Sequence, residues 1–202
     1  MNKFEKPNDP AWTRLAVKID PKYDGPGVSL PCASLKAKTP GISGNVRIAA
    51  VQKPTVPEAI EAAEGEELVL IARASGFQIY VCRPDAEGKP AWILKAPEAQ
   101  LFDQQGNAIG SHFGGPTWRH KDGSEITGRL AAKVDAPEAT AIPWLLIAVT
   151  GNSGNGVLSG VTTIQRINTI GGLAPAASEC MQGGEVEFRS SYSADYYFYA
   201  RR

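Results

Sequence analysis

The sequence contains few of the residues that common catalytic and metal sites require. Its 202 residues include three cysteines and two histidines, His112 and His120. A structural zinc site needs four Cys or His ligands at suitable spacing, and the chain has neither CxxC nor HxxxH. It also lacks the G-x-S-x-G turn of many serine hydrolases and the D-x-[DN]-x-[DN]-G loop that binds calcium. The sequence therefore predicts no metal and no cofactor, and it points to no catalytic nucleophile.

The sequence also lacks a charge excess and a long apolar run. Lys plus Arg and Asp plus Glu number 21 each, so the formal net charge is zero, whereas nucleic-acid binders usually have a basic excess. No stretch reaches the ~18 apolar residues of a membrane span, and residues 1–10 have no apolar segment of a secretory signal. We therefore predict no nucleic-acid partner and no membrane span. The chain as given shows no signal peptide, which leaves a cytoplasmic location open.

The composition of the first 55 residues differs from that of the rest. Residues 1–50 contain eight Lys or Arg and four Asp or Glu, an excess of four positive charges. Seven prolines up to Pro54 prevent a long helix, because each fixes φ and removes a hydrogen-bond donor. We expect an extended basic arm over residues 1–55, anchored by Trp12, and one domain over residues 56–202. The arm either lies on its own domain, which is the commoner arrangement, or binds an acidic partner.

Residues 56–202 have the patterning of an antiparallel β-protein. Short apolar runs are separated by turn residues such as Gln105-Gly106 and Asp122-Gly123. Only residues 57–67 could form a helix, and they could equally form an acidic loop. We expect an all-β fold, an antiparallel β-sandwich or flattened barrel of about ten short strands. The expected strands are residues 68–73, 77–82, 91–94, 99–102, 108–109, 125–130, 141–149, 161–168, 185–188 and 192–200.

The last expected strand is rich in tyrosine. Alternation places Tyr197 and Tyr199 on one face and Tyr196 and Phe198 on the other. One of these faces must join the core. The other either forms an exposed aromatic strip, suited to sugar rings or a protein partner, or is covered by the N-terminal arm.

Two glycine-rich polar loops provide the candidate ligand site. The first contains His112 and Trp118 around a Gly-Gly-Pro turn, and the second spans residues 151–156. His112 either serves the site or is a cross-strand residue bonded to a carbonyl. Arg166 lies between isoleucines and needs a carboxylate or carbonyl partner, and a structural ion pair is favoured over a ligand clamp. The ligand-binding candidates are His112, Trp118, Asp122, Asn152, Asn155, Arg166 and Tyr197.

An ordered set of motifs resembles a family of uncharacterised secreted proteins of bacteria and fungi. The motifs are FQIYVC (77–82), KAPEA (95–99), GGPTW (114–118), DGS (122–124), IPWLL (142–146), IQR (164–166) and YYFY (196–199), and the resemblance spans about residues 55–200. It implies export and a disulfide between Cys82 and Cys180, with two buried thiols as the alternative; Cys32 lies outside the pattern. The family has no established catalytic residues to transfer.

Fungal members of that family are often labelled malate dehydrogenase, and the sequence argues against that activity. A dinucleotide site needs a strand, a G-x-G-x-x-G turn and a helix. The glycines at 151, 154, 156 and 160 do not have this spacing, and the residues from Val161 onward alternate as a strand does. We therefore predict that the protein is not an NAD-dependent dehydrogenase.

Three functions remain open at this point. The first is a non-enzymatic binding module, exported, for a carbohydrate or phenolic small molecule. The second is a hydrolase or lyase that uses His112 with a carboxylate. The third is a structural or interaction protein that docks a partner through its N-terminal arm and aromatic strip.

Overall fold

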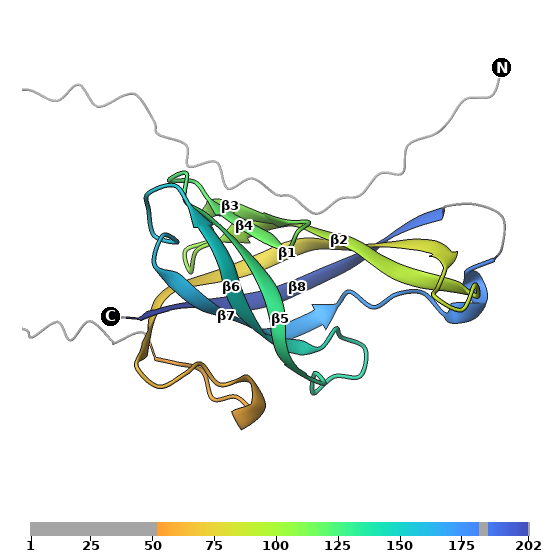
Figure 1. The fold of residues 1–202 in the computed structure, drawn as a ribbon, viewed down its shortest axis with the longest axis horizontal. Coiled ribbons are helices and arrows are strands. Elements are labelled where there is room, and N and C mark those ends of the chain that lie inside the picture. Colours follow the sequence, from red (N-terminus) through yellow and green to blue (C-terminus); the bar gives the residue numbers. More distant parts are fainter. Residues whose placement is uncertain (1–51, 182–185, 202) are drawn as a thin grey trace, which may run out of the picture. The chain divides into compact units, whose positions relative to one another are not determined.

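The computed structural model describes residues 52–181 and 186–201, whose fold is drawn in Figure 1. The arm predicted over residues 1–55 lies outside the described residues, except for its last four positions. Trp12 and Cys32 lie outside them as well.

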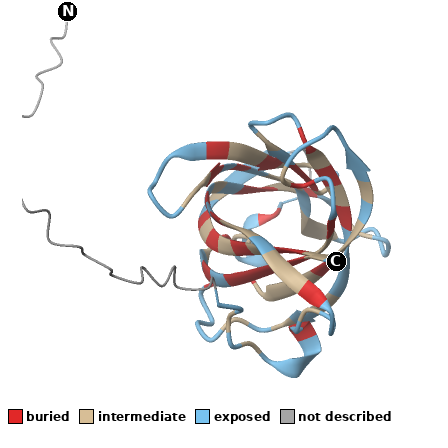
Figure 2. Ribbon diagram, turned by 90° about the vertical axis from the view of Figure 1, so that its left-hand side faces the viewer, coloured by how far each residue is buried: buried red, intermediate tan, exposed pale blue. Residues whose placement is uncertain are grey.

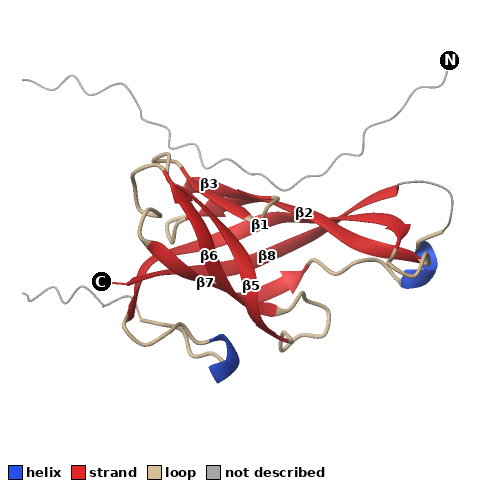
Figure 3. Ribbon diagram, in the orientation of Figure 1, coloured by secondary structure: helices blue, strands red, loops and turns tan. Residues whose placement is uncertain are grey.

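Eight antiparallel strands, joined in chain order, close into one barrel (Figure 3). This confirms the predicted all-β fold, and among its two forms the barrel is the one observed. In the part of the chain that the structure describes, helix is limited to the 3-10 turns η1 (Glu58–Ile60) and η2 (Ala177–Glu179), and neither could cross a membrane. The strands are β1 (Glu66–Pro84), β2 (Pro90–Phe102), β3 (Ala108–Phe113), β4 (Thr117–His120), β5 (Glu125–Val134), β6 (Trp144–Ser153), β7 (Val161–Gly171) and β8 (Val186–Arg201).

The prediction of about ten short strands was wrong in number and length. Six of the expected strands merge in pairs into β1, β2 and β8, and β4 was not predicted. Ser75-Gly76, expected to be a turn, continues β1. A Cβ on Gly76 would lie 2.5 Å from the Cα of Ala99 on β2, so this glycine allows two backbones to approach closely. Glycine in a strand therefore marked close packing here and not a reversal of the chain.

Of the two alternatives for residues 57–67, a helix or an acidic loop, the structure shows the loop with one short 3-10 turn. Only Glu58–Ile60 is helical, and Glu66 already belongs to β1. Residues 53–65, which we call the strap, lie instead on the outer face of the barrel, where η1 contacts β5 and β6. The backbone oxygen of Ile60 accepts a 2.6 Å hydrogen bond from Gln165 on β7, and the side chain of Ile60 is fully buried. The strap is thus held by burial and hydrogen bonds and not by helix formation.

The core fills the inside of the barrel with small and large side chains in complementary places. In Figure 2 the buried residues alternate with exposed ones around the ring of strands. Ala72 and Ala74 on β1 are fully buried, and Ala72 lies opposite Tyr196 of β8. These alanines leave room for the fully buried Tyr196, Phe198 and Trp118, because a closely packed interior must balance small against large groups.

Three strands continue past the barrel as a twisted ribbon, at the right of Figure 1. This ribbon, which we call the finger, is formed by residues 79–84 of β1, 90–95 of β2 and 186–189 of β8. The predicted disulfide is present: Cys82 in the finger is bonded to Cys180, with Cα atoms 5.3 Å apart. Trp92 Nε1 also donates to the backbone oxygen of Ala176 at 3.3 Å. The segment that follows β7 is therefore fastened to the finger.

Candidate functional site

A cavity of about 140 Å³ opens inside the barrel at the end that bears the finger. This end is formed by the β3–β4 turn with Pro116, the β5–β6 connection and the finger strands. Leu94 and Leu130 lie at its mouth and are 51% and 53% exposed. The lining residues are Gln78, Leu94, Pro97, His112, Pro116, Trp118, Leu130, Leu145, Ile147, Arg166 and Tyr196.

An aromatic group forms one wall of the cavity. His112 on β3 and Trp118 on β4 are opposite each other in the ladder, and their rings stack with centroids 4.3 Å apart. Tyr196 on β8 meets the edges of both rings at 5.3 and 5.8 Å. A Cβ on Gly128 would lie 3.4 Å from the Trp118 ring and 2.5 Å from Ile147, so the glycine leaves room for this packing. Three strands thus fix a flat, rigid surface.

His112 is held as a neutral imidazole. Its Nδ1 lies 2.9 Å from the backbone oxygen of Thr117, and because a carbonyl only accepts, Nδ1 bears the proton and Nε2 is left as an acceptor. Burial lowers the pKa of His112 to about 4, the carbonyl of Thr117 acts in the opposite direction, and the charge of Arg166 lowers it further. The predicted carbonyl partner is therefore present, and at neutral pH the ring is an uncharged part of the wall.

Arg166 places a positive charge in the barrel interior. It lies between Leu145 and Tyr196 in the ladder, so its side chain faces inward with theirs, and it is 9% exposed. One Nη donates to the backbone oxygen of Pro143 at 2.8 Å. The expected structural ion pair is not observed: none of the ion pairs among residues 52–181 and 186–201 involves Arg166. Its partner is a carbonyl, and its charge has no counter-charge in the described chain.

Buried hydrogen-bonding atoms without a partner collect around the cavity. Among the described residues, four of them belong to side chains of its lining: Gln78 Nε2, Trp118 Nε1, Arg166 Nε and the Tyr196 hydroxyl. A fifth is the hydroxyl of Tyr192, which lies close to the Tyr196 hydroxyl, as Arg166 also does, but without the geometry of a full hydrogen bond. Burial raises the pKa of both phenols, so both remain protonated and can donate. Most buried polar groups in proteins find partners, so such a cluster needs an explanation.

The other candidates from the glycine-rich loops lie at the opposite end of the barrel. The β3–β4 and β4–β5 turns are at opposite ends of β4, so the Asp122 turn is separated from the cavity. Asp122 accepts hydrogen bonds from the Ser124 hydroxyl at 2.6 Å and from the Val157 amide at 2.8 Å, and these bonds hold its pKa well below its usual range. Asn152 donates to the backbone oxygens of Leu158 and Val161.

These two side chains therefore fasten the loop between β6 and β7. Asn155 in that loop is exposed. The structure thus brings together His112, Trp118 and Arg166 and does not bring Asp122, Asn152 or Asn155 to them.

Tyr197 and Tyr199 share a face, as the alternation predicted; this is the outer face, but they do not form an exposed strip there. Tyr199 is 1% exposed: its hydroxyl donates to Gln165 at 2.6 Å, and Lys53 of the strap lies over its ring. Tyr197 is half-buried and lines an open outer groove with Ile71, Phe102 and the β2–β3 turn. Tyr199 is thus covered, and Lys53, one of the last residues of the predicted arm, contributes to that cover.

Gln78 and Tyr192 are the site residues that sequence reasoning missed. Gln78 was placed on a strand face, but nothing in the sequence distinguished a lining glutamine from a solvated one. The register shift in β1 lies between Ile79 and Tyr80, beyond Gln78, so Gln78 keeps the inward face that Ala72 and Ala74 occupy. Among the described residues, no three His, Cys, Asp or Glu side chains gather where they could hold a metal ion.

Comparisons with known proteins assign no function to this site. No curated protein and no solved structure matches the chain. One family model, described as a protein of unknown function, covers residues 62–200, which is most of the chain and includes every residue of the cavity lining. The chain therefore belongs to the family of proteins of unknown function DUF3455.

Proposed function

We propose that this protein is a non-enzymatic binding module that holds a small aromatic molecule in the cavity of its barrel. The observation that supports this function is the set of four buried, unpartnered hydrogen-bonding atoms around a cavity that opens to solvent. A bound molecule would supply their partners. Binding sites typically combine an apolar lining with a few polar groups that fix orientation, which is the composition of this cavity.

The size and lining of the cavity favour a single flat ring of the phenolic class over a sugar. Its volume of about 140 Å³ is close to the ~150 Å³ of an apolar protein cavity that accepts benzene. Six of its eleven lining residues are leucine, isoleucine or proline, and the stacked pair of His112 and Trp118 supplies a flat wall. A sugar, with hydroxyls on every side, would place several of them against these apolar groups.

A binding role fits the chemistry of the cavity better than hydrolysis or elimination. The lining holds no Asp or Glu, so His112 has no carboxylate beside it there. A general base works best with a pKa near the working pH, and the pKa of His112 is about 4. The disulfide between Cys82 and Cys180 supports an oxidising environment and hence export.

The test is to fill the cavity and measure binding. The purified full chain is titrated with phenol, benzyl alcohol and glucose, using calorimetry and thermal unfolding. Leu145→Trp places a large side chain in the cavity, and Leu173→Trp is the matched control because Leu173 is exposed and does not line it. We expect the aromatic probes to bind and stabilise the wild type and the control, by ~2.7 kcal/mol at 100 times Kd, and not Leu145→Trp.

Three outcomes would contradict the proposal. If no aromatic probe bound the wild type, the cavity would not be a site of this class. If Leu145→Trp kept full binding, the site would lie elsewhere, for example in the outer groove beside Tyr197. If glucose bound better than phenol, the class would be carbohydrate. Leu145→Phe provides a smaller filling variant should the tryptophan prevent folding.

A further inference from the structure

We propose that the ligand of this cavity is an anion, a small aromatic monocarboxylate whose carboxylate oxygens pair with Arg166. This inference rests on the proposed function and adds the charge and the recognition residue. It begins from a charge that the described chain leaves unpaired in its interior.

The guanidinium of Arg166 is a buried positive charge without an anionic partner among the described residues. Arginine remains protonated in proteins, so this group cannot escape the cost of burial by losing its proton. One Nη donates to Pro143, the guanidinium lies close to the neutral hydroxyl of Tyr196, and Nε has no hydrogen-bond partner among the described residues. Buried charges are normally paired, and a bound carboxylate would supply the missing counter-charge.

The other unpartnered atoms of the lining also favour an acceptor-rich ligand. Trp118 Nε1 can only donate, and the protonated hydroxyl of Tyr196 can donate as well. An ionised carboxylate offers about four acceptor sites and no donor, so it suits several converging donors. The hydroxyl of Tyr80, which lies near enough to sense the Arg166 charge, already donates to Gly172 at 2.7 Å. No anionic side chain lines the cavity to compete with the ligand.

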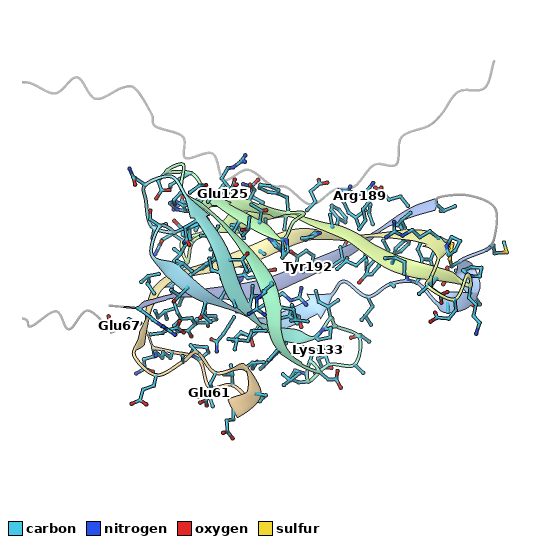
Figure 4. All side chains as sticks on the ribbon, viewed as in Figure 1. Glu61, Glu67, Glu125, Lys133, Arg189 and Tyr192 are labelled. Atoms are coloured by element: carbon cyan, nitrogen blue, oxygen red, sulfur yellow. A yellow bond between two sulfur atoms is a disulfide. The ribbon has the colours of Figure 1, made fainter. Side chains whose placement is uncertain are left out.

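One exposed lysine lies beside the lining of the cavity. Lys133 lies directly opposite Leu145 in the β5–β6 ladder, and Figure 4 shows it near the end of β5. It is exposed, so its ammonium group can attract an anion toward the opening. With a volume close to that of a benzene-binding cavity and exposed leucines at its rim, the site has room for one ring and not for a larger anion.

One anionic ring compound and two neutral ring compounds of similar size test the inference. Benzoate, benzamide and benzyl alcohol share one ring, and acetate supplies the carboxylate alone. Each is titrated into the full-length protein at pH 7 by calorimetry, at low and at high salt. Arg166→Gln removes the charge but keeps an NH donor for Pro143. Arg166→Lys keeps the charge but loses the planar guanidinium, which can donate two parallel hydrogen bonds to a carboxylate. Arg129→Gln is the matched control, because Arg129 is an exposed arginine that does not line the cavity.

The expected result is a preference that depends on Arg166. Benzoate should bind the wild type and Arg129→Gln at least tenfold more tightly than benzamide, benzyl alcohol or acetate. Arg166→Gln should lose about 10- to 100-fold in benzoate affinity, which is the range of one charge-assisted hydrogen bond, and less than threefold for the neutral probes. Arg166→Lys should fall between, and high salt should weaken the two carboxylates, benzoate and acetate, but not the neutral probes.

Two sets of results would overturn the inference, and they differ. If benzoate and the neutral rings bound the wild type equally, or if Arg166→Gln kept the preference for benzoate, the charge would have no role, while the aromatic site itself would stand. If no ring bound at all, or if Leu145→Trp bound benzoate as well as the wild type did, the cavity would not be the site, and the proposed function would fail together with this inference.

Discussion

The disulfide between Cys82 and Cys180 should contribute more to stability than any other single feature of the fold. It joins the finger to the segment after β7 across 98 positions of the sequence. Six of the eight strands, β2 to β7, lie inside the loop that it closes. We therefore consider the replacement of both cysteines by alanine, which removes the bond without leaving a lone thiol.

The expected effect follows from the length of that loop. A cross-link reduces the entropy of the unfolded chain, and for a loop of about 98 residues this gives about 4.7 kcal/mol at 25 °C. For a domain of about 150 residues each kcal/mol lowers Tm by about 2–4 °C, so the loss corresponds to about 10–19 °C. Both sulfurs are buried, at 3% and 6% exposure, so the small cavities left by the substitutions should add to the loss.

The assay is chemical unfolding by urea, followed by far-UV circular dichroism, with and without reductant. The wild type should lose about 4–5 kcal/mol on reduction, the Cys82→Ala/Cys180→Ala variant should be unaffected by reductant, and Cys32→Ser should behave as the wild type does. A loss below about 1 kcal/mol would refute the reasoning, because it would mean that the finger opens separately from the barrel and that the bond restrains only a local equilibrium.

Two further predictions concern pH and the strap. Burial lowers the pKa of His112 to about 4 from its ordinary ~6.5, so its contribution to stability is complete above pH 6.5 and is lost as the pH falls through 4. By pH 4 the free energy of unfolding of the wild type should fall by about 3 kcal/mol relative to that of His112→Phe. Urea unfolding at each pH measures this difference, and equal pH profiles of the two proteins would contradict the prediction. The buried carboxylate of Glu66 accepts hydrogen bonds from the hydroxyls of Thr162 and Thr163 and from the Ala63 amide of the strap. Glu66→Ala should therefore lower the free energy of unfolding by about 3 kcal/mol, and Glu66→Gln, which keeps an acceptor for the hydroxyls, should lower it clearly less. Equal losses in urea unfolding would show that the charge, and not the hydrogen bonds, matters.

The fold class could be predicted from the sequence because alternation and turn residues are local signals. The turns at Gln105-Gly106 and Asp122-Gly123 are where the sequence placed them, and Pro143, which cannot donate a hydrogen bond inside a sheet, directly precedes β6. Strand length was not predictable in the same way. Gly76 looks like a turn residue in sequence, and only the nearby backbone of Ala99 explains it. A local signal cannot distinguish a glycine that turns the chain from one that admits a neighbour.

The candidate site could be predicted only residue by residue. His112, Trp118 and Arg166 were selected for their types, but their convergence depends on the closure of the barrel, which brings β3 and β4 across from β7 and β8. The polar loop over residues 151–156 looked equally suitable. It lies at the other end because three antiparallel strands, β4, β5 and β6, separate it from the β3–β4 turn, and each strand carries the chain to the opposite end. The sequence did not reveal this relation while β4 remained unrecognised.

The disulfide and the proposed site belong to one connected part of the structure. Cys180 fastens the segment after β7, whose residue Gly172 pairs with Ala141 of the β5–β6 connection. Next to it, Ile142 donates its amide to Gly171 at 2.9 Å and accepts a 2.6 Å bond from Thr169.

Pro143 follows directly, and its carbonyl is the acceptor for Arg166. Gly171 and Gly172 both have positive φ, which a side chain would disfavour, so this path of backbone contacts depends on glycine. An unpaired charge inside a barrel would destabilise a loosely held end. The covalent bond and the contacts that extend from it to Pro143 therefore explain how this fold can keep Arg166 in place, ready for an anionic ligand.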